Sequence, residues 1–91
     1  MADLSLRLVI RGRVQGVGFR YWMTREAEKR GLNGWVRNLP DGSVEALVSG
    51  PDAAVQDMIE VSRRGPRRSH VGSIEQMPAD APAETGFRQF R

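Results

Sequence analysis

The sequence predicts an α+β fold in which two helices cover one face of an antiparallel sheet. Two observations predict it. Stretches that alternate apolar and polar residues, as strands do, are interleaved with two stretches of helical spacing, and the order is strand, helix, strand, strand, helix, strand. That order is typical of the split βαβ arrangement of a ferredoxin-like sandwich, here extended by a short final strand at one edge.

The first half of the chain predicts a strand, a glycine-rich loop and a helix. Apolar residues alternate with mostly polar ones over residues 4–10, which gives a strand one buried face. Glycines interrupt this pattern over residues 12–20, and four-residue apolar spacing then indicates a helix over about residues 21–30, with Gly31 at its end. The apolar residues that carry the two patterns are Leu4, Leu6, Leu8 and Ile10, then Phe19, Met23 and Ala27.

The middle of the chain predicts a hairpin and a second helix. Residues 35–39 and 44–48 have strand character and flank the turn residues Pro40-Asp41-Gly42. A helix follows Gly50-Pro51 and stops before Gly65-Pro66, because proline suits a first helical turn and cannot continue a helix. Its buried face is expected to carry Val55, Met58, Ile59 and Ser62.

Two further strands are predicted from weaker patterns. Residues 71–77 form a fourth strand, but Val71 and Ile74 fall on opposite faces unless a bulge intervenes. A polar connection over residues 78–86 leads to a short edge strand at residues 87–90.

This topology places two polar segments at the same edge of the sheet. The first two strands run parallel with the third between them, because a helical crossover returns the chain to its starting end. The loop that ends at Arg20 and the strand end at Arg37 and Asn38 are therefore two strand spacings apart, about 10 Å. One ligand and long side chains can fill that gap.

Composition limits the kinds of site that the chain can build. Its 91 residues suffice for one domain, predicted as a single domain over residues 1–91. Cysteine is absent and His70 is the only histidine, so we expect neither a disulfide nor a metal site. No signal peptide and no apolar run of about 18 residues is visible. We therefore expect a soluble, cytoplasmic protein with no membrane partner. We also expect a monomer.

The basic residues are almost all arginine. The net charge is only +3, but thirteen of the fourteen basic residues are arginine. Guanidinium groups match phosphate and carboxylate oxygens, which favours a phosphate ester, an acyl phosphate or a nucleic acid as partner. The arginine content alone is explained better by solvated surface arginines, as in the proteins of an arginine-rich proteome.

The glycine-rich loop is the candidate anion site. Residues 14–20 lie between a strand and a helix, where unpaired N–H groups and the positive helix end attract anions. Glycine spacing alone is explained better by an ordinary tight turn followed by a solvated arginine. The loop is neither a P-loop, since no lysine is followed by serine or threonine, nor a G-x-G-x-x-G motif, nor an RNA-recognition motif.

Two long motifs make the interpretation more specific. Residues 10–20, IRGRVQGVGFR, resemble the first signature of the acylphosphatases, and residues 34–44, GWVRNLPDGSV, followed by Gly50, resemble the second. The resemblance implies a stand-alone enzyme that hydrolyses acyl phosphates without metal or cofactor. It implies that Arg20 binds the phosphoryl group and Asn38 orients the attacking water. The phosphate cradle would use Gln15, Gly16, Val17, Gly18 and Phe19, and it would also hold inorganic phosphate or another anion.

The residues are consistent with this chemistry. An acyl phosphate is an activated anhydride, so positioning and charge stabilisation can carry catalysis. Neither signature holds a nucleophile and base pair before Ser43. The amide of Asn38 can hold a water for attack on phosphorus, as glutamine does in some GTP hydrolases, and the proton can pass to the substrate phosphate.

Other interpretations stay open from the residues alone. Asn38 precedes a turn, and asparagine in such a position often only initiates the turn. The arginines at positions 63–68 suit a solvated helix end. One alternative of another class is a nucleic-acid-binding module, which we rank well behind the enzyme. The nucleic acid would bind the open sheet surface with Arg7, Arg11, Trp35 and Arg37. A further alternative is an anion-binding module without turnover.

Overall fold

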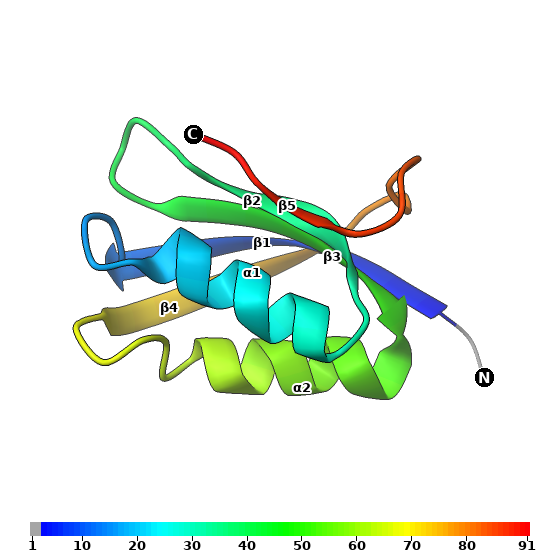
Figure 1. Ribbon diagram of the computed structural model, residues 1–91. Coiled ribbons are helices and arrows are strands. Elements are labelled where there is room, and N and C mark those ends of the chain that lie inside the picture. Colours follow the sequence, from blue (N-terminus) through cyan, green and yellow to red (C-terminus); the bar gives the residue numbers. More distant parts are fainter. Residues whose placement is uncertain (1–2) are drawn as a thin grey trace.

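Five strands form one sheet, and both helices pack on the same face of it, in the computed structural model of residues 3–91 (Figure 1). The elements follow one another in the predicted order, which confirms the ferredoxin-like fold class. They are β1 (Asp3–Arg13), α1 (Phe19–Lys29), β2 (Asn33–Asn38), β3 (Val44–Pro51), α2 (Asp52–Ser62), β4 (His70–Pro78) and β5 (Phe87–Gln89).

The strand order in the sheet is β4-β1-β3-β2-β5, so β3 lies between β1 and β2 as predicted. Neighbours among the first four strands are antiparallel, but β5 runs parallel to β2. The expectation of a wholly antiparallel sheet is therefore wrong at this edge, and the sheet is mixed. The reason is geometric: β4 ends at the side of the sheet where β2 begins, and the connection over residues 79–86 crosses that side before β5 starts.

A bulge resolves the irregular pattern of the fourth strand. Arg11 pairs with Ser73, whereas the next residue, Gly12, pairs with Val71, so one residue of β4 is extra. Val71 and Ile74 consequently both pack against the core, as a bulge requires. A side chain at Gly12 would begin 2.2 Å from the carbonyl oxygen of His70, so the bulge depends on glycine.

The helix faces are those that the spacing predicts. In α1 the buried residues are Phe19, Met23 and Ala27, and in α2 they are Val55, Met58, Ile59 and Ser62. They pack on Leu8 and Ile10 of β1 and on the valines of β2 and β3. This core fixes the two helices against the sheet and with them the start of α1, where the candidate site lies.

Several element bounds differ from the predicted ones. α1 begins at Phe19 and not near Tyr21, which places Arg20 inside the first helical turn. It ends at Lys29, and Gly31 follows its C-cap: the Gly31 N–H donates to the carbonyl of Glu28 over 3.0 Å, and the Leu32 N–H donates to that of Ala27. β2 begins before Trp35, at Asn33, and β3 extends to Pro51.

The single-domain span of residues 1–91 stays a prediction, and its first two residues, Met1 and Ala2, lie outside the described residues. No helix in residues 3–91 is long and apolar enough to cross a membrane.

Candidate active site

The loop between β1 and α1 leaves its backbone donors free. Gly16 and Gly18 adopt left-handed dihedrals, with φ of 73° and 79°, and a Cβ on either would meet no atom within 4 Å. Glycine is needed there for its dihedral angles and not for space. Within residues 3–91 no hydrogen bond uses the backbone N–H groups of residues 15–18. When residues in the left-handed conformation alternate with a residue of negative φ, successive backbone N–H groups point to the same side. Such a concave group of donors can bind an anion.

The same loop supplies the start of α1. Gly18 is the N-cap residue, and no side chain caps the helix there. The first N–H groups of a helix have no intrahelical partner and carry the positive end of the helix dipole. Loop and helix therefore present unpaired donors to one point, next to the side chain of Arg20.

A small pocket of about 110 Å³ lies at this point. It brings together the two residues that the sequence predicts to be catalytic, Arg20 and Asn38, and part of the predicted cradle. The lining residues are Val14, Gly16, Gly18, Phe19, Arg20, Tyr21, Asn38 and Gln89. Of the predicted phosphate-binding residues, Gln15 and Val17 do not line it, because Val17 packs against the core and the side chain of Gln15 bonds elsewhere.

Arg20 carries a charge that no carboxylate balances in residues 3–91. Its side chain is half-buried, and Nη1 donates a hydrogen bond of 2.5 Å to the backbone carbonyl oxygen of Phe90. No ion pair of the described chain includes Arg20. The guanidinium is thus held by a neutral acceptor and keeps its attraction for an anion.

Asn38 is the last residue of β2 and pairs with Val44 at the end of the β2–β3 ladder. Its Oδ1 is buried and has no hydrogen-bond partner among the described residues. A buried polar atom without a partner costs about 1–3 kcal/mol, so this oxygen is poised to accept a hydrogen bond from a water or a ligand.

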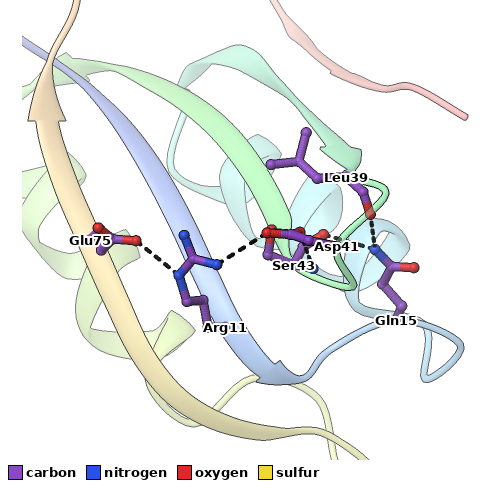
Figure 2. A network of polar contacts seen from close by, with 6 residues as sticks. All are labelled: Arg11, Gln15, Leu39, Asp41, Ser43 and Glu75. Carbon is purple, nitrogen blue, oxygen red and sulfur yellow. Dashed lines mark hydrogen bonds and ion pairs between the residues drawn. The ribbon is translucent and has the colours of Figure 1, made fainter.

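The turn after Asn38 is held from two sides (Figure 2). From the phosphate loop, Gln15 Nε2 donates to the carbonyl oxygens of Leu39 and Ser43, each over 2.8 Å. From β1, Arg11 Nη1 pairs with Asp41 Oδ2 at 3.2 Å. Hydrogen bonds from the hydroxyl and N–H of Ser43, and the guanidinium of Arg11, lower the pKa of Asp41. Asp41 is therefore a carboxylate at neutral pH and stiffens the turn.

The open face of the sheet is arranged differently. Arg7 and Arg37 both donate to the buried carboxylate of Glu45. Burial alone would raise the pKa of Glu45, but the bonds from Arg37 and Arg7 outweigh it and lower the pKa. Arg11 pairs with Glu75 at 2.9 Å as well as with Asp41. The arginines that the nucleic-acid alternative needs are thus already neutralised.

Comparison with known proteins decides the family. The family model for acylphosphatase matches residues 6–91. The chain is 54% identical over 88 residues to an acylphosphatase of Nitrobacter hamburgensis, covering 97% of this chain and 89% of that protein. It is 56% identical over 85 residues to one of Azorhizobium caulinodans, covering 92% and 91%. The chain belongs to the acylphosphatase family. The predicted resemblance is confirmed, and with it the class of enzyme, a hydrolase acting on acid anhydrides.

A solved structure agrees with this acylphosphatase in fold. The crystal structure of acylphosphatase from Bacillus subtilis superimposes with a TM-score of 0.90 at 40% sequence identity, over 97% of this chain and 99% of that one. The ferredoxin-like arrangement predicted from the element order is therefore that of a solved acylphosphatase.

Sequence reasoning missed two residues that line the pocket, Tyr21 and Gln89; it placed Val14 in the candidate loop but not among the phosphate-binding residues. Tyr21 directly follows the predicted loop, and the start of α1 at Phe19 would have indicated it. Gln89 had no signal in the sequence, because it reaches the site through the parallel pairing of β5 with β2, in which it lies opposite Val36.

Proposed function

We propose that this acylphosphatase hydrolyses the carboxyl–phosphate bond of small acyl phosphates, with the phosphoryl group bound at the start of α1. The pocket there is lined by Gly16 and Gly18, whose loop has free backbone donors, and by the side chain of Arg20. Preorganised donors of this kind stabilise a phosphoryl group and the charge that develops on it during transfer. The products are a carboxylate and inorganic phosphate.

Arg20 supplies the fixed positive charge of the proposed site. A guanidinium can donate two parallel hydrogen bonds to phosphate oxygens, and such charged bonds are about twice as strong as neutral ones. Its hydrogen bond to the carbonyl of Phe90 uses Nη1 and leaves donors on the other nitrogens. The contact with Phe90 holds the guanidinium near the pocket without neutralising it.

Asn38 places the nucleophile. Its unpartnered Oδ1 can accept a hydrogen bond from a water in the pocket, and this fixes the direction of the water's lone pair. The side chain is not a base at neutral pH, so the proton of the water passes to an oxygen of the substrate phosphate. The leaving carboxylate is stable as an anion and needs no general acid, and catalysis then comes from orientation and charge.

One observation carries the proposal: an arginine without a carboxylate partner and a buried asparagine oxygen without a hydrogen-bond partner, both judged within residues 3–91, line the same small pocket. The buried oxygen of Asn38 is costly in the isolated protein because it lacks a hydrogen-bond partner, and the charge of Arg20 is balanced by no carboxylate of residues 3–91. Both are explained at once by a bound anion and a bound water.

The test is release of phosphate from benzoyl phosphate, measured with and without a chelator of divalent cations. We expect turnover that the chelator does not change, because the proposed steps use only side chains and backbone donors. Loss of activity on chelation, restored by added metal, would contradict the proposed site. A folded protein without turnover would leave a module that only binds anions.

The proposal includes the protein's state in solution. We propose a monomeric, cytoplasmic enzyme whose site also holds inorganic phosphate, the product. Gel filtration is expected to give the mass of one chain, and phosphate is expected to inhibit benzoyl phosphate hydrolysis competitively. Inhibition that excess substrate does not relieve would place the phosphate elsewhere.

A further inference from the structure

The side chain of Gln15 faces away from the phosphate loop in which it stands. Its Nε2 donates to the carbonyl oxygens of Leu39 and Ser43, each over 2.8 Å (Figure 2). A primary amide has two N–H donors, and both are used here. This pair of bonds, which we name the Gln15 bridge, connects the β1–α1 loop to the β2–β3 turn across 24 and 28 residues of sequence.

The two acceptors of the Gln15 bridge close the turn that follows Asn38. Leu39 N–H donates to the carbonyl of Ser43 over 2.9 Å, and Gly42 N–H donates to Leu39 over 3.2 Å. Leu39 and Ser43 are thus the first and last residues of a small hydrogen-bonded loop. Because Asn38 directly precedes it, a displacement of this loop moves the asparagine.

The residues before and after Gln15 in the sequence connect the Gln15 bridge to the candidate pocket. Val14 and Gly16, on either side of Gln15, line the same pocket as Asn38. One residue therefore connects the wall that would hold the phosphate to the strand end that would hold the water. The ion pair of Arg11 and Asp41 also supports the turn, but about half of each side chain is exposed. The hydrogen bonds of Gln15 are partly buried. Exposed ion pairs contribute little rigidity compared with buried hydrogen bonds.

We infer that Gln15 is a positioning residue, which sets the distance between the phosphate loop and Asn38 through its bonds to Leu39 and Ser43. The inference rests on the proposed role of Asn38. Positioning is the main source of rate in such a reaction, and a displacement of about 1 Å can cost on the order of a hundredfold. The backbone of Gln15 belongs to the phosphate loop, but its side chain acts on the water.

Gln15→Met tests the inference, because methionine has a similar length and no N–H donors. We expect kcat for benzoyl phosphate to fall by about tenfold to a hundredfold, while the inhibition constant of inorganic phosphate stays within about threefold. The matched control is Gln56→Met, an exposed glutamine on α2, which is expected to leave both unchanged. A fall in phosphate affinity as large as the fall in kcat would overturn the inference, since the substitution would then act on the cradle.

The double variant with Asn38→Ala shows whether Gln15 acts through Asn38. In that background Gln15→Met is expected to lower kcat by no more than about twofold, because the group that it positions is gone. An equal loss in both backgrounds would overturn the inference. If Asn38→Ala alone keeps wild-type kcat, the proposed role of Asn38 fails. The NMR signals of the Asn38 side-chain amide test the bridge independently, and unchanged signals in Gln15→Met would overturn it.

Gln15→Glu keeps the test decisive if the methionine variant does not fold. A carboxylate cannot donate to either carbonyl, whereas the protonated acid can donate to one of them. The ratio of kcat in this variant to that of the wild type is therefore expected to rise as the pH is lowered. A ratio that does not change with pH would contradict a role of the Gln15 donors.

Discussion

Arginines at the start of α1 and on the open face of the sheet have opposite surroundings. On the sheet face, Arg7 and Arg37 share the buried carboxylate of Glu45, and Arg11 pairs with two exposed carboxylates. At the start of α1, Arg20 donates to a backbone carbonyl and has no carboxylate partner in residues 3–91. The comparison teaches that an excess of arginine says little about anion binding until the partner of each guanidinium is known.

The difference has a simple electrostatic origin. On the sheet face, Arg7, Arg11 and Arg37 are balanced by an equal number of carboxylates, so little net charge is left there to attract an anion. A guanidinium beside unpaired helix donors adds its charge to theirs, and the field of both attracts an anion. Arg20 is of this second kind, although it is half-buried like the paired Arg7.

Arg20→Ala is expected to have the largest effect. We expect kcat/KM for benzoyl phosphate to fall by about a thousandfold or more, because the one side-chain cation that lines the pocket within residues 3–91 is removed. Arg37→Ala is the matched variant from the paired group and is expected to change kcat/KM by less than about threefold. Equal losses in the two variants would show that charge at the pocket is not what distinguishes Arg20.

Asn38→Ala is expected to have the next largest effect, and to lower kcat much more than the affinity for phosphate. We expect kcat to fall by about a hundredfold to a thousandfold, as when one stabilising polar group is removed from other hydrolases, with little change in the inhibition constant of phosphate. Steady-state kinetics with phosphate as inhibitor measures both. A parallel loss of kcat and phosphate affinity would indicate that Asn38 only maintains the turn.

Glu45→Gln tests the paired region through stability and not through turnover. We expect the free energy of unfolding at neutral pH to fall by about 1–3 kcal/mol, because the negative charge is lost and only one of the two guanidinium groups keeps an oxygen acceptor. The folded pKa of Glu45 lies below its ordinary value of 4.5, so the carboxylate stabilises the fold above that value. This contribution is lost as the pH falls through the lowered folded pKa.

Urea unfolding of wild type and Glu45→Gln at neutral pH and near pH 3 measures the prediction. The difference between the two proteins is expected to shrink as the wild-type carboxyl is protonated. A difference that is the same at both pH values would show that packing, and not the charge of Glu45, is responsible.

Nucleic-acid binding is expected to show the smallest effect. With its sheet-face arginines paired, the protein should give no saturable binding to a labelled single-stranded RNA at about 150 mM salt, as fluorescence anisotropy would detect. Trp35 is also occupied, since it stacks on Phe90 with ring centroids 6.0 Å apart and lies under Arg37. Saturable binding that Arg37→Ala abolishes would restore the alternative function.

Local patterns in the sequence predicted most of the fold. The spacing of Phe19, Met23 and Ala27 predicted the buried face of α1, and the conflict between Val71 and Ile74 predicted the bulge. These features depend on residues close in the chain, where periodicity is a direct physical signal. The parallel pairing of β5 could not be predicted in this way, because it depends on how residues 79–86 cross the sheet.

The sequence predicted some of the residues that line the candidate pocket but none of their contacts. The two motifs predicted Arg20 and Asn38, and the topology predicted that they would lie near each other. The partners came only from the structure: the carbonyl of Phe90 for Arg20 and the turn carbonyls for Gln15. Side-chain direction at a loop position follows from tertiary contacts, and no local pattern in the sequence encodes it.

The position of β1 in the sheet has a consequence for the folding rate. β1 pairs with β3 and with β4, so residue 3 meets residue 51 and residue 13 meets residue 70. Only the β2–β3 hairpin joins neighbouring strands through a short turn. High sequence separation of contacts slows folding, because loop-closure entropy is lost before the contacts form. In refolding experiments, catalytic activity should therefore return later than the hairpin, since the Gln15 bridge needs β1 and β3 side by side.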